Sequence, residues 1–131
     1  MSWLDSTKLQ LRKLVKEGKF QQNEKLDPYV TELLSEIFTG MQGRYSRLKI
    51  ILALAEDPLN TFQLSKKLGS DYKSVQHNLK ILEKNHLLEK IGNNYAGMFF
   101  ISELMSSNLP TLLKIIEKVD KKLNKKKKYI S

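Results

Sequence analysis

The sequence predicts a mainly α-helical fold that contains one small two-stranded β-hairpin. Apolar residues recur at spacings of three and four through most of the 131 residues, as in amphipathic helices. Capping residues, prolines and glycines mark where these helices start and stop. One turn-forming triplet, Gly92-Asn93-Asn94, separates two short runs that are typical of β-strands. A chain of this length buries one core, so we expect a single domain with extensions at its ends.

Two helices are predicted before residue 44. The first begins at Ser6, an available N-cap, and stops at Gly18. The second begins at Asp27-Pro28, because aspartate caps a helix and proline fits its first turn, and it ends at Gly40. Its apolar face is too large to stay exposed, so it must cover the domain formed by residues 44–102 or meet a second copy of itself. This face consists of Val30, Leu33, Leu34, Ile37 and Phe38.

Three helices are predicted in close succession between residues 44 and 85. Thr61 can cap the short middle helix, and Gly69 separates it from the longer third helix, which Ser70 or Asp71 can cap. His86, like Asn85 before it, stands where a helix usually leaves through a left-handed residue. The predicted helices are Arg44–Glu56, Phe62–Leu68 and Asp71–Asn85.

A hairpin and a last helix complete the predicted fold. The strands are the runs Leu87–Ile91 and Tyr95–Ile101. Pro110 can open the last helix, which reaches about Lys125. Apolar residues spaced 3, 4, 3 and 4 apart form a coiled-coil seam two heptads long along it. The seam consists of Leu109, Leu112, Ile116, Val119 and Leu123.

The net charge of +9 is large for this length and is unevenly placed. Residues 44–102 carry nine cations against five acids, and residues 103–131 carry eight against three. This excess favours nucleic acid as a partner, because neutralising phosphates releases their counterions. A role in solubility alone is the alternative.

Several other classes of function lack support in the sequence. No apolar run approaches the roughly 18 residues of a membrane span, and the N-terminus lacks a secretory leader. We therefore expect no membrane association and a cytoplasmic, nucleoid-associated protein. With no cysteine and two histidines, neither a metal site nor a cofactor is expected. No nucleophile–base motif or phosphate-binding glycine loop is present, so we expect no enzyme.

The polar face of the predicted helix Asp71–Asn85 is the best candidate for a binding surface. It offers hydrogen-bond donors and cations and no acid, which suits a DNA major groove. We expect Lys73, Gln76 and His77 to approach bases and Ser74 and Lys80 to anchor phosphate. Tyr72 can stack on a sugar or bind a phosphate, or it can pack against the preceding turn. A solvated helix face is the alternative for the whole set.

Further DNA contacts are predicted on both sides of this helix. Lys66 and Lys67, at the end of the short helix, are candidate backbone contacts; Arg44 and Arg47 fit the same role or simply that of a helix surface. The hairpin is short and carries little charge, so we expect it to position phosphate or to contribute nothing measurable. Its candidate residues are Lys90, Asn93, Asn94 and Tyr95.

Residues 44–102 resemble a winged helix-turn-helix of the ArsR-like type found in archaeal and bacterial transcriptional regulators. The residues that match are 47–54, Pro58, 64–69, Val75, 79–83 and 87–88. The resemblance implies that the helix Asp71–Asn85 enters the major groove while the hairpin lies on a flanking minor groove or phosphate strand. It also implies that the terminal helices build a symmetric dimer. Asn78 and His86 depart from it, standing where such sequences often carry histidine and glycine.

We therefore predict a dimeric, sequence-specific regulator that binds double-stranded DNA. Its parts are an N-terminal helical extension (1–43), a winged helix-turn-helix (44–102), and a C-terminal dimerisation helix with a basic tail (103–131). Homodimerisation would use the seam together with Val30, Leu33, Leu34 and Ile37, although both apolar faces can instead pack within one monomer. A sequence-tolerant architectural DNA-binding protein and a protein-interaction module are the alternatives. The lysine, isoleucine and asparagine bias fits an archaeal or AT-rich source.

Overall fold

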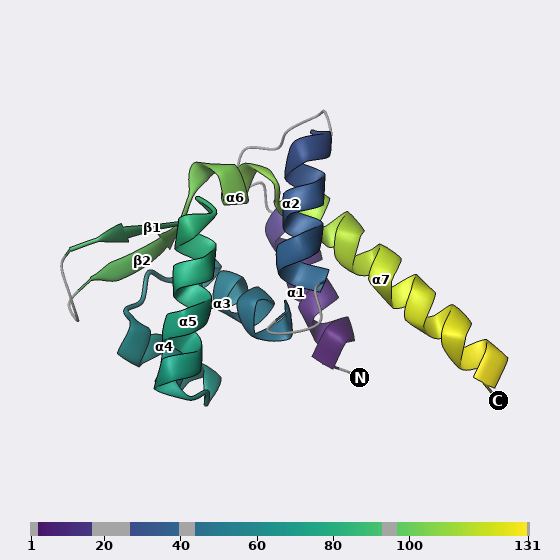
Figure 1. The fold of residues 1–131 in the computed structure, drawn as a ribbon, viewed down its shortest axis with the longest axis horizontal. Coiled ribbons are helices and arrows are strands. Elements are labelled where there is room, and N and C mark those ends of the chain that lie inside the picture. The colour runs from purple at the N-terminus through teal and green to yellow at the C-terminus, as the bar shows by residue number, and fades with distance from the viewer. Residues whose placement is uncertain (1–2, 17–26, 40–43, 93–96, 131) are drawn as a thin grey trace. The chain divides into compact units, whose positions relative to one another are not determined.

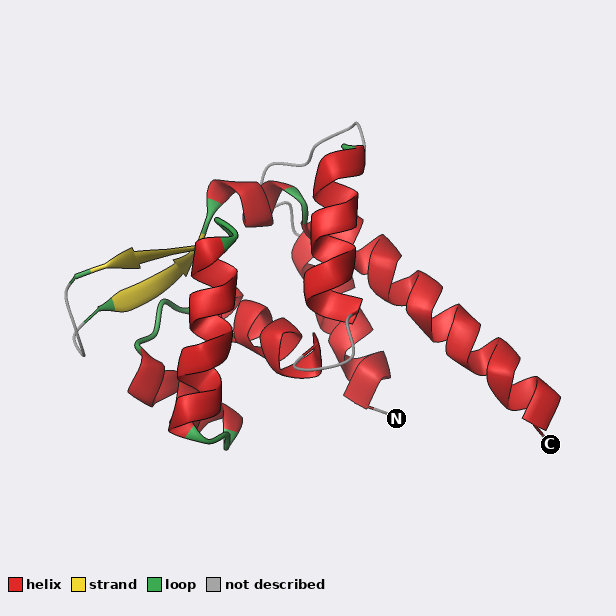
Figure 2. Ribbon diagram, viewed as in Figure 1, coloured by secondary structure: helices red, strands yellow, loops and turns green. Residues whose placement is uncertain are grey.

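The computed structural model describes residues 3–16, 27–39, 44–92 and 97–130 (Figure 1). The chain forms two compact units, one of residues 1–40 and 107–131 and one of residues 41–106. The first unit holds α1 (Trp3–Lys16), α2 (Pro28–Thr39) and α7 (Leu109–Ile130). The second holds α3 (Arg44–Glu56), α4 (Thr61–Leu68), α5 (Tyr72–Lys84), β1 (Leu88–Ile91), β2 (Met98–Ile101) and α6 (Glu103–Ser107). Figure 2 shows that helices dominate, as predicted.

In the first unit, α7 packs against both α1 and α2. The apolar faces of the three helices are buried, and Arg12 of α1 pairs with Glu117 of α7 at 2.8 Å. The apolar face of α2 therefore finds its cover on α7 of the same chain. Among the described residues, no helix is both long enough and apolar enough to cross a bilayer.

Two predicted helix ends in this unit are wrong. Ser6 does not cap α1, which already begins at Trp3. The last helix continues past Lys125 to Ile130. Lysine is a good helix former, so the run of lysines in the sequence does not end the helix.

In the second unit, α3 is the central helix and contacts α4, α5 and β2. Five successive residues, 50–54, are buried, so this helix is enclosed on nearly all sides. Because α3 is enclosed, its neighbours α4, α5 and β2 have a rigid support.

Local signals explain how α4 and α5 are oriented. The N-cap of α4 is Asn60 and not Thr61, because the Asn60 side chain accepts from the Gln63 N–H while the Gln63 side chain accepts from the Asn60 N–H. Gly69 then ends α4 in the left-handed conformation, with φ of 60°. Asp71 caps α5, as one of the two predicted alternatives.

The hairpin follows directly from the end of α5. His86 takes the left-handed conformation, with φ of 62°, at the exit predicted for it. β1 and β2 pair antiparallel from Leu88 opposite Ile101 to Ile91 opposite Met98. The Phe99 N–H donates to the Leu59 carbonyl, which ties β2 to the loop before α4. With α4, the Gly69 turn and α5, this hairpin completes the predicted winged helix-turn-helix.

The short helix α6 was not predicted. Ser102 caps it, since its hydroxyl accepts from the Met105 N–H at 3.2 Å and donates to the His86 carbonyl at 2.7 Å. Ser102 is buried, so one hydroxyl both starts α6 and fixes the exit from α5.

Candidate nucleic-acid interface

The inner face of α5 anchors the helix on the second unit. Val75, Asn78, Leu79 and Leu82 are buried, at the spacings of 3, 1 and 3 that place them on one side. At the N-terminus, the Asp71 carboxylate accepts from the Ser74 N–H at 3.2 Å and from the Ser74 hydroxyl at 3.4 Å. The helix is therefore held at its start and along its inner face.

The outer face of α5 is a ridge of four exposed residues: Lys73, His77, Lys80 and Lys84. Successive helical residues lie about 100° apart, so these positions all point away from the buried face. The ridge carries three lysines and no acid. Lys84 was missed in the sequence analysis, although its spacing of four from Lys80 would have placed it on this ridge.

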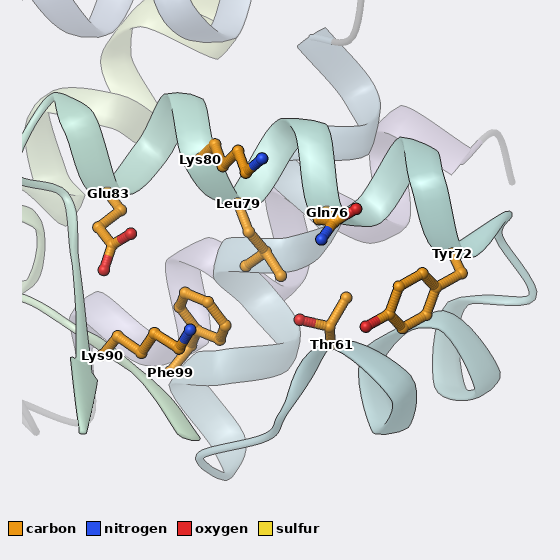
Figure 3. A pocket seen from close by; sticks show the side chains of 8 residues that line it. All are labelled: Thr61, Tyr72, Gln76, Leu79, Lys80, Glu83, Lys90 and Phe99. Atoms are coloured by element: carbon orange, nitrogen blue, oxygen red, sulfur yellow. The ribbon is translucent and has the colours of Figure 1, made fainter. Parts of the chain in front are cut away.

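One flank of the ridge borders an open pocket of about 320 Å³ between α5, the start of α4 and the hairpin (Figure 3). Leu79 and Phe99 supply its apolar surface, while Gln76, Lys80 and Lys90 are among its polar residues. Gln76 thus lies on a flank of α5, beside Leu79, and not on the ridge. Glu83 also lines the pocket, which places one acid beside two lysines.

Lys90 is held on this flank by its packing on β2. Its ammonium lies 5.6 Å from the centre of the Phe99 ring, which is within range of a cation–π interaction. A Cβ atom at Gly97 would collide with the Lys90 side chain, so the glycine leaves the room that Lys90 occupies. The hairpin therefore presents this lysine toward α5.

Asn78 is a buried polar residue on the inner face, with 6% of its surface exposed. Its side-chain oxygen accepts from Arg47 Nε of α3 at 3.2 Å. Burial lowers the pKa of Arg47, although a guanidinium remains protonated at any physiological pH. Arg47 thus links α3 to α5, and Asn78, one of the two departures from the resemblance, has a structural partner.

This region is similar to a known family of regulatory proteins. Residues 45–90, from α3 to β1, match the family model of the bacterial regulatory protein, arsR family. The predicted resemblance to ArsR-like regulators is confirmed for this segment. The match supports a role in DNA-binding transcriptional regulation. No protein of curated function matches the chain.

Two solved structures are similar to the chain over most of its length. Staphylococcus aureus MarR, in complex with salicylate and kanamycin, is 17% identical with a TM-score of 0.49, over 79% of this chain and 69% of that one. The adhesin competence repressor AdcR of Streptococcus pyogenes is 19% identical with a TM-score of 0.41, over 82% and 68%.

The ArsR-like segment contains most of the predicted DNA contacts. Lys73, Ser74, Gln76, His77 and Lys80 of α5 are all exposed, as a binding face requires. Tyr72 is half-buried and reaches from the start of α5 toward Thr61 in the pocket (Figure 3). The Ser74 hydroxyl donates to the capping Asp71, so this predicted phosphate anchor already has an acceptor within the helix.

The two predicted contacts on α4 are exposed and have partners within the chain. Lys66 lies 4.9 Å from the centre of the Phe62 ring, and Lys67 pairs with Glu56 at 3.0 Å. The remaining predicted contacts, at the hairpin tip, are Asn93, Asn94 and Tyr95, which fall outside the described residues.

The predicted dimerisation residues lie in the other unit, on α2 and α7. Six of them are buried within the single chain: Val30, Leu34, Ile37, Leu109, Leu112 and Ile116. Leu33 and Val119 are half-buried, and the side chain of Leu123 is outside the description. The apolar faces of α2 and α7 therefore pack within one chain, which was the stated alternative to a dimer interface. In the described part of the chain, no group of three or more potential metal ligands occurs.

Proposed function

We propose that this protein binds specific sites on double-stranded DNA as a homodimer and regulates transcription there. The exposed ridge of α5 is the observation that carries the proposal. A helix fixed along its inner face, with three lysines and a histidine outward and no acid among them, matches the shape and potential of a major groove. The match to a family of regulators supports the same function.

The proposed roles follow from where each side chain lies. His77 and Lys73 occupy the ridge and approach base edges, while Gln76 reaches bases from the pocket flank. Glutamine can pair with N6 and N7 of adenine, and lysine with the acceptors of guanine. Lys80 and Lys90 face the same pocket and bind phosphate, which fixes the register of the protein without reading sequence.

The homodimer is proposed because a pair of such helices reads two half-sites about one helical turn apart, roughly 34–36 Å. The buried residues of α2 and α7 cannot face a second copy while they pack on each other. A dimer would therefore use the edge that includes Leu33 and Val119, or exchange α7 between copies. Sedimentation of the full chain over a range of concentrations tests this part separately.

Selection of bound duplexes from a random pool, followed by titration over a salt series, tests the function. A regulator enriches one sequence with related half-sites and binds it at least about 10³-fold more tightly than random DNA. Strong salt dependence without enrichment would instead indicate an architectural DNA-binding protein. No binding at low salt would contradict DNA binding and leave a protein-interaction module. The burial of the apolar face of α2 within the chain weighs against that last role.

The proposal also covers location and chemistry. A regulator of chromosomal DNA works in the cytoplasm in association with the nucleoid. Groove insertion and phosphate contact need no cofactor, metal or catalytic group, so we expect DNA binding to persist in the presence of a metal chelator.

A further inference from the structure

A second pocket borders the other flank of α5. It is open, has a volume of about 230 Å³, and lies between α3, the turn after α4 and the first half of α5. Ser46 and Lys49 of α3 line it, together with Ser70 of the turn and Ser74 of α5. None of the first three was identified as a candidate contact from the sequence.

The two pockets lie on opposite sides of the α5 ridge. Ser74 and Asn78 face the second pocket, whereas Gln76 and Glu83 face the first. With about 100° between successive residues, the ridge of Lys73, His77, Lys80 and Lys84 separates the two sides. A helix that lies in a major groove about 12 Å wide has one sugar–phosphate strand on each side of it. Each flank of α5 would therefore face a different strand.

The residues of the second pocket suit a phosphate group. Lys49 supplies a cation, and the hydroxyls of Ser46 and Ser70 are donors of the type that contacts DNA phosphate oxygens. Asp71 opposes this, because its exposed carboxylate lines the same pocket. That carboxylate already accepts two hydrogen bonds from Ser74, so its place is explained by helix capping.

We infer that this pocket holds a backbone phosphate of duplex DNA, with Lys49 as the charged contact. The phosphate belongs to the strand opposite the one that Lys80 and Lys90 contact. This inference rests on the proposed function and deepens it, because it assigns one strand to each flank of α5.

Lys49→Gln tests the inference on the duplex selected by the wild-type protein. The variant should bind selected and random duplexes several-fold more weakly at low salt, and the slope of log affinity against log salt should fall by about 0.9. Lys114→Gln, which removes an exposed cation of α7, is the control for loss of one charge. Lys49→Arg should keep wild-type affinity, and thermal unfolding of each variant shows whether the fold is intact.

A scan with single neutral methylphosphonates locates the contact. At one or two positions of one strand, the neutral linkage should weaken DNA binding by the wild-type protein and leave DNA binding by Lys49→Gln unchanged. For Lys80→Gln, the positions at which the neutral linkage no longer affects binding should lie on the other strand. Equal methylphosphonate effects on the wild-type protein and Lys49→Gln would overturn the inference while DNA binding itself stands. A wild-type protein that binds no duplex would overturn the proposed function and this inference with it.

Asp71→Asn provides a test of opposite sign. Asparagine caps a helix as well as aspartate, so α5 keeps its start while the pocket loses its negative charge. Affinity for all duplexes should rise a few-fold at low salt. Unchanged or weaker binding by a variant that unfolds at the wild-type temperature would contradict a phosphate in this pocket.

Discussion

Two amphipathic helices, α5 and α7, were both predicted as interfaces, one through its polar face and one through its apolar seam. In the folded chain α5 keeps its polar ridge exposed, whereas the seam of α7 is covered by α1 and α2. The polar interface is thus present in a single chain, and most of the apolar one is already occupied.

The difference has a simple physical cause. Burying apolar surface stabilises the fold by about 25 cal/mol per Å², so an apolar face is covered by whichever apolar surface the chain itself offers. Charged side chains gain nothing from burial and stay in water unless a partner pairs with them. A polar ridge predicted from sequence therefore remains exposed and available for binding after folding. An apolar seam predicts only that it is buried, and does not indicate whether the same chain or a second copy covers it.

Leu112→Ala should have the largest effect and tests the α7 side of this comparison. Leu112 is fully buried, so its truncation should lower the free energy of unfolding by about 2–5 kcal/mol. Urea unfolding measures the loss. Leu9→Ala is the control, since Leu9 is 51% exposed and should change stability by no more than about 0.5 kcal/mol.

The concentration dependence of unfolding shows whether the seam of α7 packs within one chain or joins two copies. If α7 packs within one chain, the loss in Leu112→Ala should be the same at low and high protein concentration. A loss that appears only at concentrations where the wild-type protein is dimeric would show that the seam joins two copies.

Much of the second unit was predictable because its signals are local. The bounds of α3, the break between α4 and α5 at Gly69, the left-handed exit at His86 and the antiparallel pairing of two strands all follow from neighbouring residues. The outward face of α5 followed from helical spacing alone. The predicted N-cap at Thr61 failed for an equally local reason, because Asn60 forms a reciprocal pair with Gln63.

What could not be predicted depends on contacts between distant residues. The burial of α3 on nearly all sides requires α4, α5 and β2 together. Likewise, Asn78 resembles a surface residue until Arg47 is seen beside it, 31 positions earlier in the chain. The two pockets beside α5 also combine residues from separate elements. The sequence alone therefore does not indicate that Lys49 lies beside α5.

Asn78→Ala should have the next largest effect and tests the inner face of α5. It removes the acceptor of the Arg47 hydrogen bond and leaves a half-buried guanidinium less well satisfied, at a cost of about 1–3 kcal/mol in unfolding free energy. Asn78→Asp keeps an oxygen acceptor and should stay closer to the wild-type stability. A loss of the same size in both variants would mean that packing, and not the hydrogen bond, matters at this position.

Substitutions on the outer face should separate base reading from phosphate contact. Gln76→Ala and His77→Ala should reduce the preference for the selected site over random DNA, by up to about 1–3 kcal/mol for a bidentate contact. Lys80→Ala should weaken binding to both duplexes alike and lower the salt slope by about 0.9. Competition titrations measure both quantities. Equal effects of all three variants on every duplex would contradict the assigned roles.

Glu56→Gln should have the smallest effect. It tests Lys67, which is exposed like the ridge of α5 but already has a partner within the chain, as the seam of α7 does. Lys67 pairs with Glu56 at 3.0 Å across α3 and α4. An exposed ion pair contributes about 0–1 kcal/mol, so stability should hardly change. If Lys67 contacts the DNA backbone, removing the competing carboxylate should raise affinity for all duplexes by a small factor at low salt, and this gain should vanish in Glu56→Gln/Lys67→Gln. The same gain in the double variant would assign the effect to the lost negative charge alone and remove Lys67 from the interface.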